Sequence, residues 1–221
     1  MAHFTEKGRL LMAIIRDNRT NKDQTIIMPA DRVPGPRQGH WTYEAYAALP
    51  EDGNRYEIMQ GVLMMAPAHE PAHQGIAEEI NSYLRSQILY TGRGLVLTSP
   101  IDVVLSEHTT VQPDVLVLLK EHLNRLQKKR IVGIPDLAVE VISPSSAAYD
   151  RLVKYNVYER MRVPEYWLVN IDEQTIEVFV LEADTYSSLG VFQGDQSLVS
   201  RIVPEITIPV SQLFNWTHGL L

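Results

Sequence analysis

The chain has 221 residues, of which 45% are hydrophobic and 21% are charged, and its formal net charge is −7. This composition is ordinary for a globular protein, and no apolar run approaches the roughly 20 residues of a membrane-spanning helix, so we expect no membrane association. The acidic balance argues against a protein that coats nucleic acid through bulk electrostatics. Because cysteine is absent, thiolate catalysis is excluded and any bound metal must use oxygen or imidazole ligands.

The first 39 residues are predicted to form an extension before the main domain. Apolar runs at 9–16 and 25–28 are separated by a polar stretch, which is typical of a hairpin, and three prolines and two glycines within 29–39 then indicate a linker. The apolar run at 10–15 is too short for a secretory signal, so a cytoplasmic location is the default expectation. Residues 40–221 are expected to form one domain.

The main domain is predicted to begin with a short helix, a hairpin and a long helix. Thr42 is a suitable N-cap for a helix that ends near residue 50. Strands at 55–59, which contain Glu57, and at 62–66 are joined by a predicted turn. Apolar residues then recur at helical spacing from about 71 to 90, which predicts the first long helix.

Runs of adjacent aliphatic residues predict the centre of a sheet in the middle of the chain. The strands expected there cover residues 95–98, 101–105, 115–119 and 137–142. A helix follows from about 147 to 161. The strands expected after it cover residues 165–170, 175–181, 186–192 and 198–203. The order of elements favours an α/β (or α+β) fold with a mixed central sheet flanked by helices.

Two carboxylates are set into these apolar runs. Asp114 opens the strand at 115–119, and Glu140 lies inside the strand at 137–142, on the same face as Ala138 and Ile142. A carboxylate removed from water loses several kcal/mol unless a cation, a metal or several donors replace the solvent. Two of them in neighbouring strands therefore suggest a shared cation. Taken singly, Asp114 capping a loop and Glu140 pairing with an arginine are the more common arrangements.

The helix that follows Glu140 carries further candidates. Asp150, Lys154 and Tyr158 are spaced by four, so they lie along one helix face, which the strand-to-helix connection turns back toward Glu140. Lys154 can then reach the same cleft. The alternative is a surface ion pair from Asp150 to Lys154, which contributes only about 0.3–0.5 kcal/mol. Spacing alone does not separate the two.

A basic segment between the two acidic strands is the best local candidate for contact with phosphates. Its basic residues are Lys120, Arg125, Lys128, Lys129 and Arg130. A solvated loop or a short helix is the more common explanation of such a charge run.

The motifs taken in order resemble the Uma-two family of predicted restriction endonucleases, within the PD-(D/E)xK nuclease superfamily. The resemblance covers roughly residues 41–214. It is carried by residues 55–58 with Gly61, His73, residues 113–115, 135–137 and 140–145, then Asp150, Lys154, Tyr158 and residues 163–167. No single piece is specific, and the ordered set carries the likeness.

This resemblance implies a restriction-endonuclease-like core and a metal-dependent endonuclease that hydrolyses DNA phosphodiester bonds with Mg²⁺ or Mn²⁺. Asp114 and Glu140 correspond to the two metal-binding acids, and Glu57 to an acid contributed from upstream. The superfamily lysine is expected two residues after the second acid, where this chain has Ile142, and Lys154 would replace it from the next helix. The auxiliary candidates are His73, Asp150 and Tyr158, and a structural histidine at a helix start is as common as a functional one.

Two other classes of function stay open. A nuclease-like fold with weak or no catalysis could act in nucleic-acid binding or assembly, which the acidic balance favours and the complete set of acids and lysine disfavours. A glycosidase would use a carboxylate pair but leaves Lys154 unexplained. We expect DNA as the partner. The apolar run at 166–168 and the C-terminal strands suit either core packing or a homodimer.

Overall fold

The computed structural model of the chain describes residues 28–66, 69–142, 150–205, 208–217 and 219. The hairpin predicted within the first 28 residues lies outside this part of the chain, apart from its last residue. Likewise, the predicted start of the helix at 147 falls outside it, and the helix is described from residue 150.

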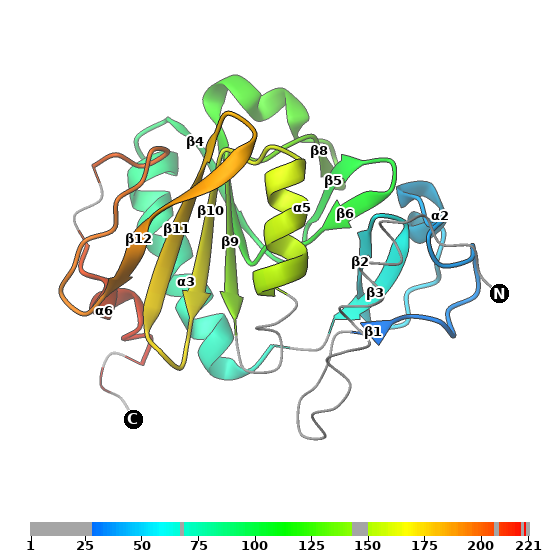
Figure 1. Cartoon of the computed structure of the whole chain (residues 1–221), viewed down its shortest axis with the longest axis horizontal. Coiled ribbons are helices and arrows are strands. Elements are labelled where there is room, and N and C mark those ends of the chain that lie inside the picture. The colour runs from blue at the N-terminus through cyan, green and yellow to red at the C-terminus, as the bar shows by residue number, and fades with distance from the viewer. Residues whose placement is uncertain (1–27, 67–68, 143–149, 206–207, 218, 220–221) are drawn as a thin grey trace.

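Two six-stranded mixed sheets form the fold (Figure 1). In spatial order, the first sheet contains β1 (Met28–Pro29), β3 (Val62–Ala66), β2 (Arg55–Met59), β6 (Thr109–Val111), β5 (Asp102–Ser106) and β8 (Arg130–Val132). The second sheet contains β12 (Thr185–Gln193), β11 (Thr175–Glu182), β10 (Glu165–Asn170), β9 (Leu137–Ile142), β7 (Val115–Leu119) and β4 (Gly94–Thr98). The predicted mixed α/β or α+β class is confirmed, but the strands divide into two sheets instead of forming one central sheet.

The helical elements lie between these strands in the sequence, except for α6, which follows β12. They are α2 (Tyr43–Ala47), α3 (Pro71–Leu84) with its π-helical continuation η2 (Arg85–Leu89), the 3₁₀ helix η3 (Lys120–Arg125), the π-helical turn η4 (Asp150–Lys154) with α5 (Tyr155–Arg160), and α6 (Val210–Leu213). Thr42 caps α2 as predicted, since its Oγ1 accepts a hydrogen bond from the Ala45 amide. Pro71 occupies the first turn of α3, where a missing N–H has no cost.

The hairpin of β2 and β3 forms as the sequence predicts. Its two-residue turn needs positive φ at both central positions, which Gln60 (φ 52°) and Gly61 (φ 80°) supply. The hairpin alternates its side chains between two environments. Tyr56 and Ile58 pack beneath Trp41 on one face, so Glu57 points to the other face, together with Met59.

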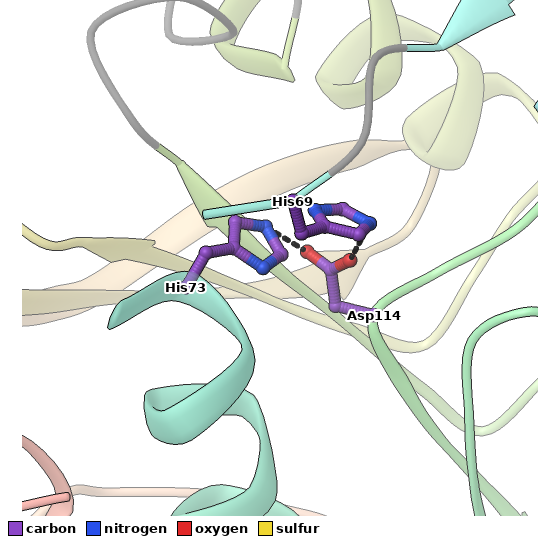
Figure 2. A group of neighbouring side chains, drawn as sticks. All are labelled: His69, His73 and Asp114. Carbon is purple, nitrogen blue, oxygen red and sulfur yellow. Dashed lines mark ion pairs between the residues drawn. The ribbon is translucent and has the colours of Figure 1, made fainter. Parts of the chain in front are cut away.

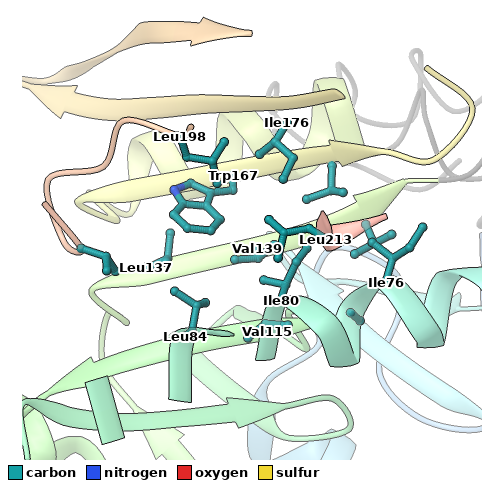
Figure 3. Close-up of a cluster of buried hydrophobic side chains, with 14 of the residues drawn as sticks. Ile76, Ile80, Leu84, Val115, Leu137, Val139, Trp167, Ile176, Leu198 and Leu213 are labelled. Atoms are coloured by element: carbon teal, nitrogen blue, oxygen red, sulfur yellow. The ribbon is translucent and has the colours of Figure 1, made fainter. Parts of the chain in front are cut away.

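Strand β9 is buried on both faces, and its alternation fixes the direction of Glu140. Leu137 and Val139 pack against α3 on one face of the second sheet (Figure 3), whereas Ala138 and Ile142 pack on the other face with α5. The predicted division of this strand into two faces is confirmed. Glu140 therefore faces α5, which lies beside β9 on the side toward the first sheet (Figure 1).

The prediction of a strand at 198–203 is wrong. Only an isolated bridge between Ser197 and Pro209 marks this segment. The buried carboxylate of Glu165 accepts hydrogen bonds from the Arg201 and Ile202 amides, at 2.7 and 3.2 Å, and from the Ser200 hydroxyl at 2.6 Å. A side chain thus satisfies the backbone donors that a neighbouring strand would otherwise bind.

The core between α3 and the second sheet should be sensitive to truncation. Ile80 is fully buried there, so Ile80→Ala is expected to lower the free energy of unfolding by about 2–5 kcal/mol through lost burial and a residual cavity. Ser82→Ala, on the exposed side of the same helix, should change it by less than about 0.5 kcal/mol. Urea unfolding followed by circular dichroism measures both, and equal effects would contradict this assignment of the core.

Candidate active site

Asp114 lies at the start of β7, where this strand meets the end of β9. The two strands are antiparallel, and Val115 is paired with Val139, so Asp114 and Glu140 occupy the next positions along their strands. Asp114 is 5% exposed, and its Oδ2 accepts a hydrogen bond from the Val141 amide at 2.8 Å. The sheet therefore brings the two predicted acids to one edge.

Lys154 joins an acid of the first sheet to an acid of the second. Its Nζ lies 2.9 Å from Glu140 Oε2 and 3.3 Å from Glu57 Oε1, and all three residues are at most 5% exposed. Tyr158, one turn further along the helix, donates its hydroxyl to Glu140 Oε1 at 2.5 Å. Burial and the Glu140 carboxylate raise the pKa of Tyr158 well above its usual value, so this hydroxyl stays a donor. Asp150 opens η4, and its side chain lies outside the described part of the structure.

Two histidines contact Asp114 from the other side (Figure 2). His73 Nε2, from the first turn of α3, lies 3.1 Å from Asp114 Oδ2, and His69 Nε2 lies 3.5 Å from Oδ1. The two imidazole rings stack with their centroids 3.8 Å apart. His73 was among the predicted residues, but His69 was not. Its signal in the sequence is the four-residue spacing to His73, and Pro71 obscured it because the helix begins between the two histidines.

The surroundings of Asp114 favour its ionised form. Burial alone would raise its pKa, but the hydrogen bond from His73 and the nearby positive charge outweigh burial and hold the pKa of Asp114 below its usual range. The surroundings of His69, in contrast, favour its neutral form. Burial lowers the pKa of His69 from 6.5 to about 4, despite the nearby Asp114 carboxylate, so its imidazole is neutral at pH 7.

Gln112 connects Glu57 to Asp102 and Arg55 through hydrogen bonds. Its amide donates to Glu57 Oε1 at 2.7 Å, its side-chain Nε2 donates to Asp102 Oδ1 at 2.8 Å, and its Oε1 accepts from Arg55 Nε at 3.2 Å. A guanidinium nitrogen of Arg55 also contacts His69 Nε2. Arg55 thus lies at the edge of the cluster and reaches both the Glu57 side and the histidine side.

The cluster carries more negative than positive charge. Glu57, Asp114 and Glu140 supply three buried carboxylates, against the ammonium of Lys154 and the half-buried guanidinium of Arg55. The formal charges of these five groups sum to −1. Buried negative charge of this kind favours a bound cation.

The basic segment lies at the far end of β7 from this cluster. Asp114 precedes β7 and Lys120 follows it, so the strand separates them by about 20 Å. Arg125 donates to the Ile134 carbonyl, and the guanidinium of Arg130 lies 4.3 Å from the centroid of the Tyr43 ring. Two of the five basic side chains therefore make local contacts, which agrees with the short-helix alternative.

The fold belongs to a class already known from crystallography. It is similar to the crystal structure of a "putative nuclease belonging to DUF820" from Anabaena variabilis ATCC 29413, with a TM-score of 0.67 and 21% sequence identity over 80% of this chain and 98% of that chain. The fold is therefore nuclease-like. No curated protein matches the chain.

The family model Uma2, described as "Putative restriction endonuclease", matches residues 43–211. The chain belongs to this family, which confirms the resemblance seen in the sequence. Within the described residues, no helix is both long and apolar enough to span a membrane.

The lysine between the two glutamates gives a prediction for stability. Lys154→Met is expected to lower the free energy of unfolding by about 3–5 kcal/mol at pH 7, because two buried carboxylates lose their shared ammonium. Adding Glu57→Gln to this variant should restore part of the loss, and Lys120→Met at an exposed lysine should have little effect. Urea unfolding in the presence of a chelator measures all three. A loss below about 1 kcal/mol for Lys154→Met would contradict the buried bridge.

The lowered pKa of His69 gives a prediction for pH. Between 6.5 and about 4, the unfolded chain takes up a proton at His69 that the folded chain does not, so this contribution to stability is complete above pH 6.5 and is lost as the pH falls toward 4. In chelator-treated protein, His69→Gln should therefore reduce the loss of stability between pH 7 and 4.5. The ring-proton NMR signal that disappears in this variant should titrate near pH 4, and a midpoint near 6.5 would contradict the prediction.

Proposed function

We propose that this protein is a metal-dependent endonuclease that hydrolyses DNA phosphodiester bonds. The observation that carries the proposal is the meeting of Asp114 and Glu140 at one edge of the second sheet, with the ammonium of Lys154 2.9 Å from Glu140. Membership of a restriction endonuclease family supports the reaction class. Catalysis requires groups that polarise the phosphate, orient water and stabilise the charge that develops on oxygen, and this cluster holds candidates for each task.

The donor set fits a hard divalent cation. Asp114, Glu140 and Glu57 offer carboxylate oxygens, the ligands that Mg²⁺ and Mn²⁺ prefer, and the cluster has an excess of negative charge. Mg²⁺ or Mn²⁺ would polarise the scissile phosphate and lower the pKa of a water molecule. Asp114 and Glu140 are the principal ligands of this proposal. Glu57 is the third, although its Oε1 also accepts hydrogen bonds from the protein.

The remaining residues orient the two acids and stabilise the negative charge that develops on the phosphate during hydrolysis. The Val141 amide orients Asp114, and the Tyr158 hydroxyl orients Glu140 through Oε1 while Lys154 contacts Oε2. Lys154 carries a positive charge at the acid edge, where it would orient water or stabilise charge on the phosphoryl oxygens. In this proposal, a lysine from the helix performs the task of the superfamily lysine, whose position is occupied by Ile142.

DNA is the proposed substrate and partner. With a net charge of −7, the chain has little long-range attraction for DNA, so binding would depend on the metal and on the cations beside the acids, Lys154 and Arg55. The cytoplasmic location and the homodimer stay predictions.

Glu140→Gln tests this function while keeping the volume of the side chain. It is expected to reduce Mg²⁺- or Mn²⁺-dependent nicking of supercoiled plasmid by at least about 100-fold. The reason is that Glu140, which is both a proposed metal ligand and the partner of Lys154, loses its charge. Glu78→Gln, at an exposed acid on α3, is the matched control and should cleave like the wild type. Full metal-dependent nicking by Glu140→Gln would overturn the proposed function.

A further inference from the structure

His69, His73 and Asp114 form a cluster that the proposed carboxylate chemistry does not use fully. One ligand atom from each residue lies within 4.8 Å of the others, and His73 and Asp114 are buried while His69 is half-buried. The three side chains come from the segment before α3, the first turn of α3 and the start of β7, and they converge on one point (Figure 2).

The separations of these atoms suit a shared metal ion. With metal–ligand bonds of about 2.1 Å, adjacent ligands lie about 3.0 Å apart in octahedral geometry and about 3.4 Å apart in tetrahedral geometry. The two nitrogen–oxygen distances in the cluster are 3.1 Å from His73 Nε2 to Asp114 Oδ2 and 3.5 Å from His69 Nε2 to Asp114 Oδ1. The three ligand atoms all lie within 4.8 Å of one another, which is compatible with their binding one ion.

The contact of Arg55 with His69 points the same way. Arg55 places a guanidinium nitrogen, which can only donate hydrogen bonds, against Nε2 of this ring. The same Nε2 faces the ionised Asp114 carboxylate at 3.5 Å. Arg55 supplies a positive charge beside this ring. A bound metal ion would take its place on Nε2 and release the guanidinium.

His73 supplies the second, independent observation. This residue is 6% exposed, its Nε2 faces Asp114, and its Nδ1 has no hydrogen-bond partner within the described part of the structure. A buried imidazole with one unpartnered nitrogen is costly as a core residue. A strong bond from Nε2 to a metal ion would offset this cost.

We propose that His69 Nε2, His73 Nε2 and Asp114 form a binding position for a first-row transition-metal ion of the Mn²⁺, Co²⁺ or Zn²⁺ class. Imidazole nitrogen is a poor ligand for Mg²⁺ and a good one for the later first-row transition metals, such as Co²⁺ and Zn²⁺. The position therefore discriminates against Mg²⁺. The inference rests on the proposed function only in sharing Asp114, and it extends that site from a carboxylate position to a mixed imidazole and carboxylate position.

The test uses Co²⁺ as the probe, because its visible absorption reports nitrogen ligands directly, with Zn²⁺ and Mg²⁺ followed by calorimetry. The full chain should bind Co²⁺ and Zn²⁺, and His69→Gln and His73→Gln should each raise the Kd for both ions by about 10–100-fold and alter the Co²⁺ spectrum. Both variants should change the Kd for Mg²⁺ by less than about 3-fold. His40→Gln, at an exposed histidine, is the matched control, and the urea midpoint of each variant verifies folding.

Three results separate this inference from the proposed function. Unchanged Co²⁺ affinity and spectrum in folded His69→Gln and His73→Gln would overturn the histidine position, whatever the nicking assay shows. Glu140→Gln should retain the Co²⁺ spectrum while losing nicking, since Glu140 is outside the histidine position. If Glu140→Gln keeps full nicking but the histidine variants lose Co²⁺, the proposed function fails and the metal position stands.

Discussion

The buried bridge from Glu57 through Lys154 to Glu140 is the constraint on which the arrangement of this site depends. Glu57 belongs to the first sheet, Glu140 to the second, and Lys154 to the helical segment between them. Removing these charges from water is costly, so the bridge adds little net stability compared with an apolar contact. However, a conformation in which one of these three charges is buried without its partner has a much higher free energy. The relative placement of the two sheets and the helix is therefore tied to the same three side chains that the proposed chemistry uses.

The apolar core fixes the directions in which Glu140 and Glu57 point. Strand β9 is packed on both faces, so a shift of one residue would turn Glu140 into the cluster beneath α3 and turn Val139 or Val141 into the polar site. The hairpin of β2 and β3 acts in the same way on Glu57, because Tyr56 and Ile58 are held under Trp41 on the opposite face. The Gln112 amide then fixes the Glu57 carboxylate. Hydrophobic alternation in two separate sheets thus aims two carboxylates at one ammonium.

Much of this could be predicted from local patterns, and the failures have physical causes. Period-two alternation in β9 and the four-residue spacing of Lys154 and Tyr158 are local signals, and both led to the observed directions. The division into two sheets depends on contacts distant in sequence, such as the single pair of Ile58 with Thr110, which leave no local pattern. Strands β6 and β8 have three residues each and are too short to show alternation. The segment at 198–203 has the composition of a strand, but its amides bind the distant Glu165 carboxylate.

Asp114 connects the two parts of the site, and its contacts explain why one aspartate can serve both. On one side the Val141 amide donates to it from β9, and on the other His73 and His69 approach it from α3 and the segment before it. The Val141 amide and His73 donate hydrogen bonds to the carboxylate and Lys154 adds a nearby positive charge, so these groups favour its ionised form. Burial opposes ionisation, and the surrounding donors overcome it. A carboxylate kept charged at this cost, between a strand end and a helix start, supports the proposed cation site, because an apolar residue would fill the same space without the desolvation penalty.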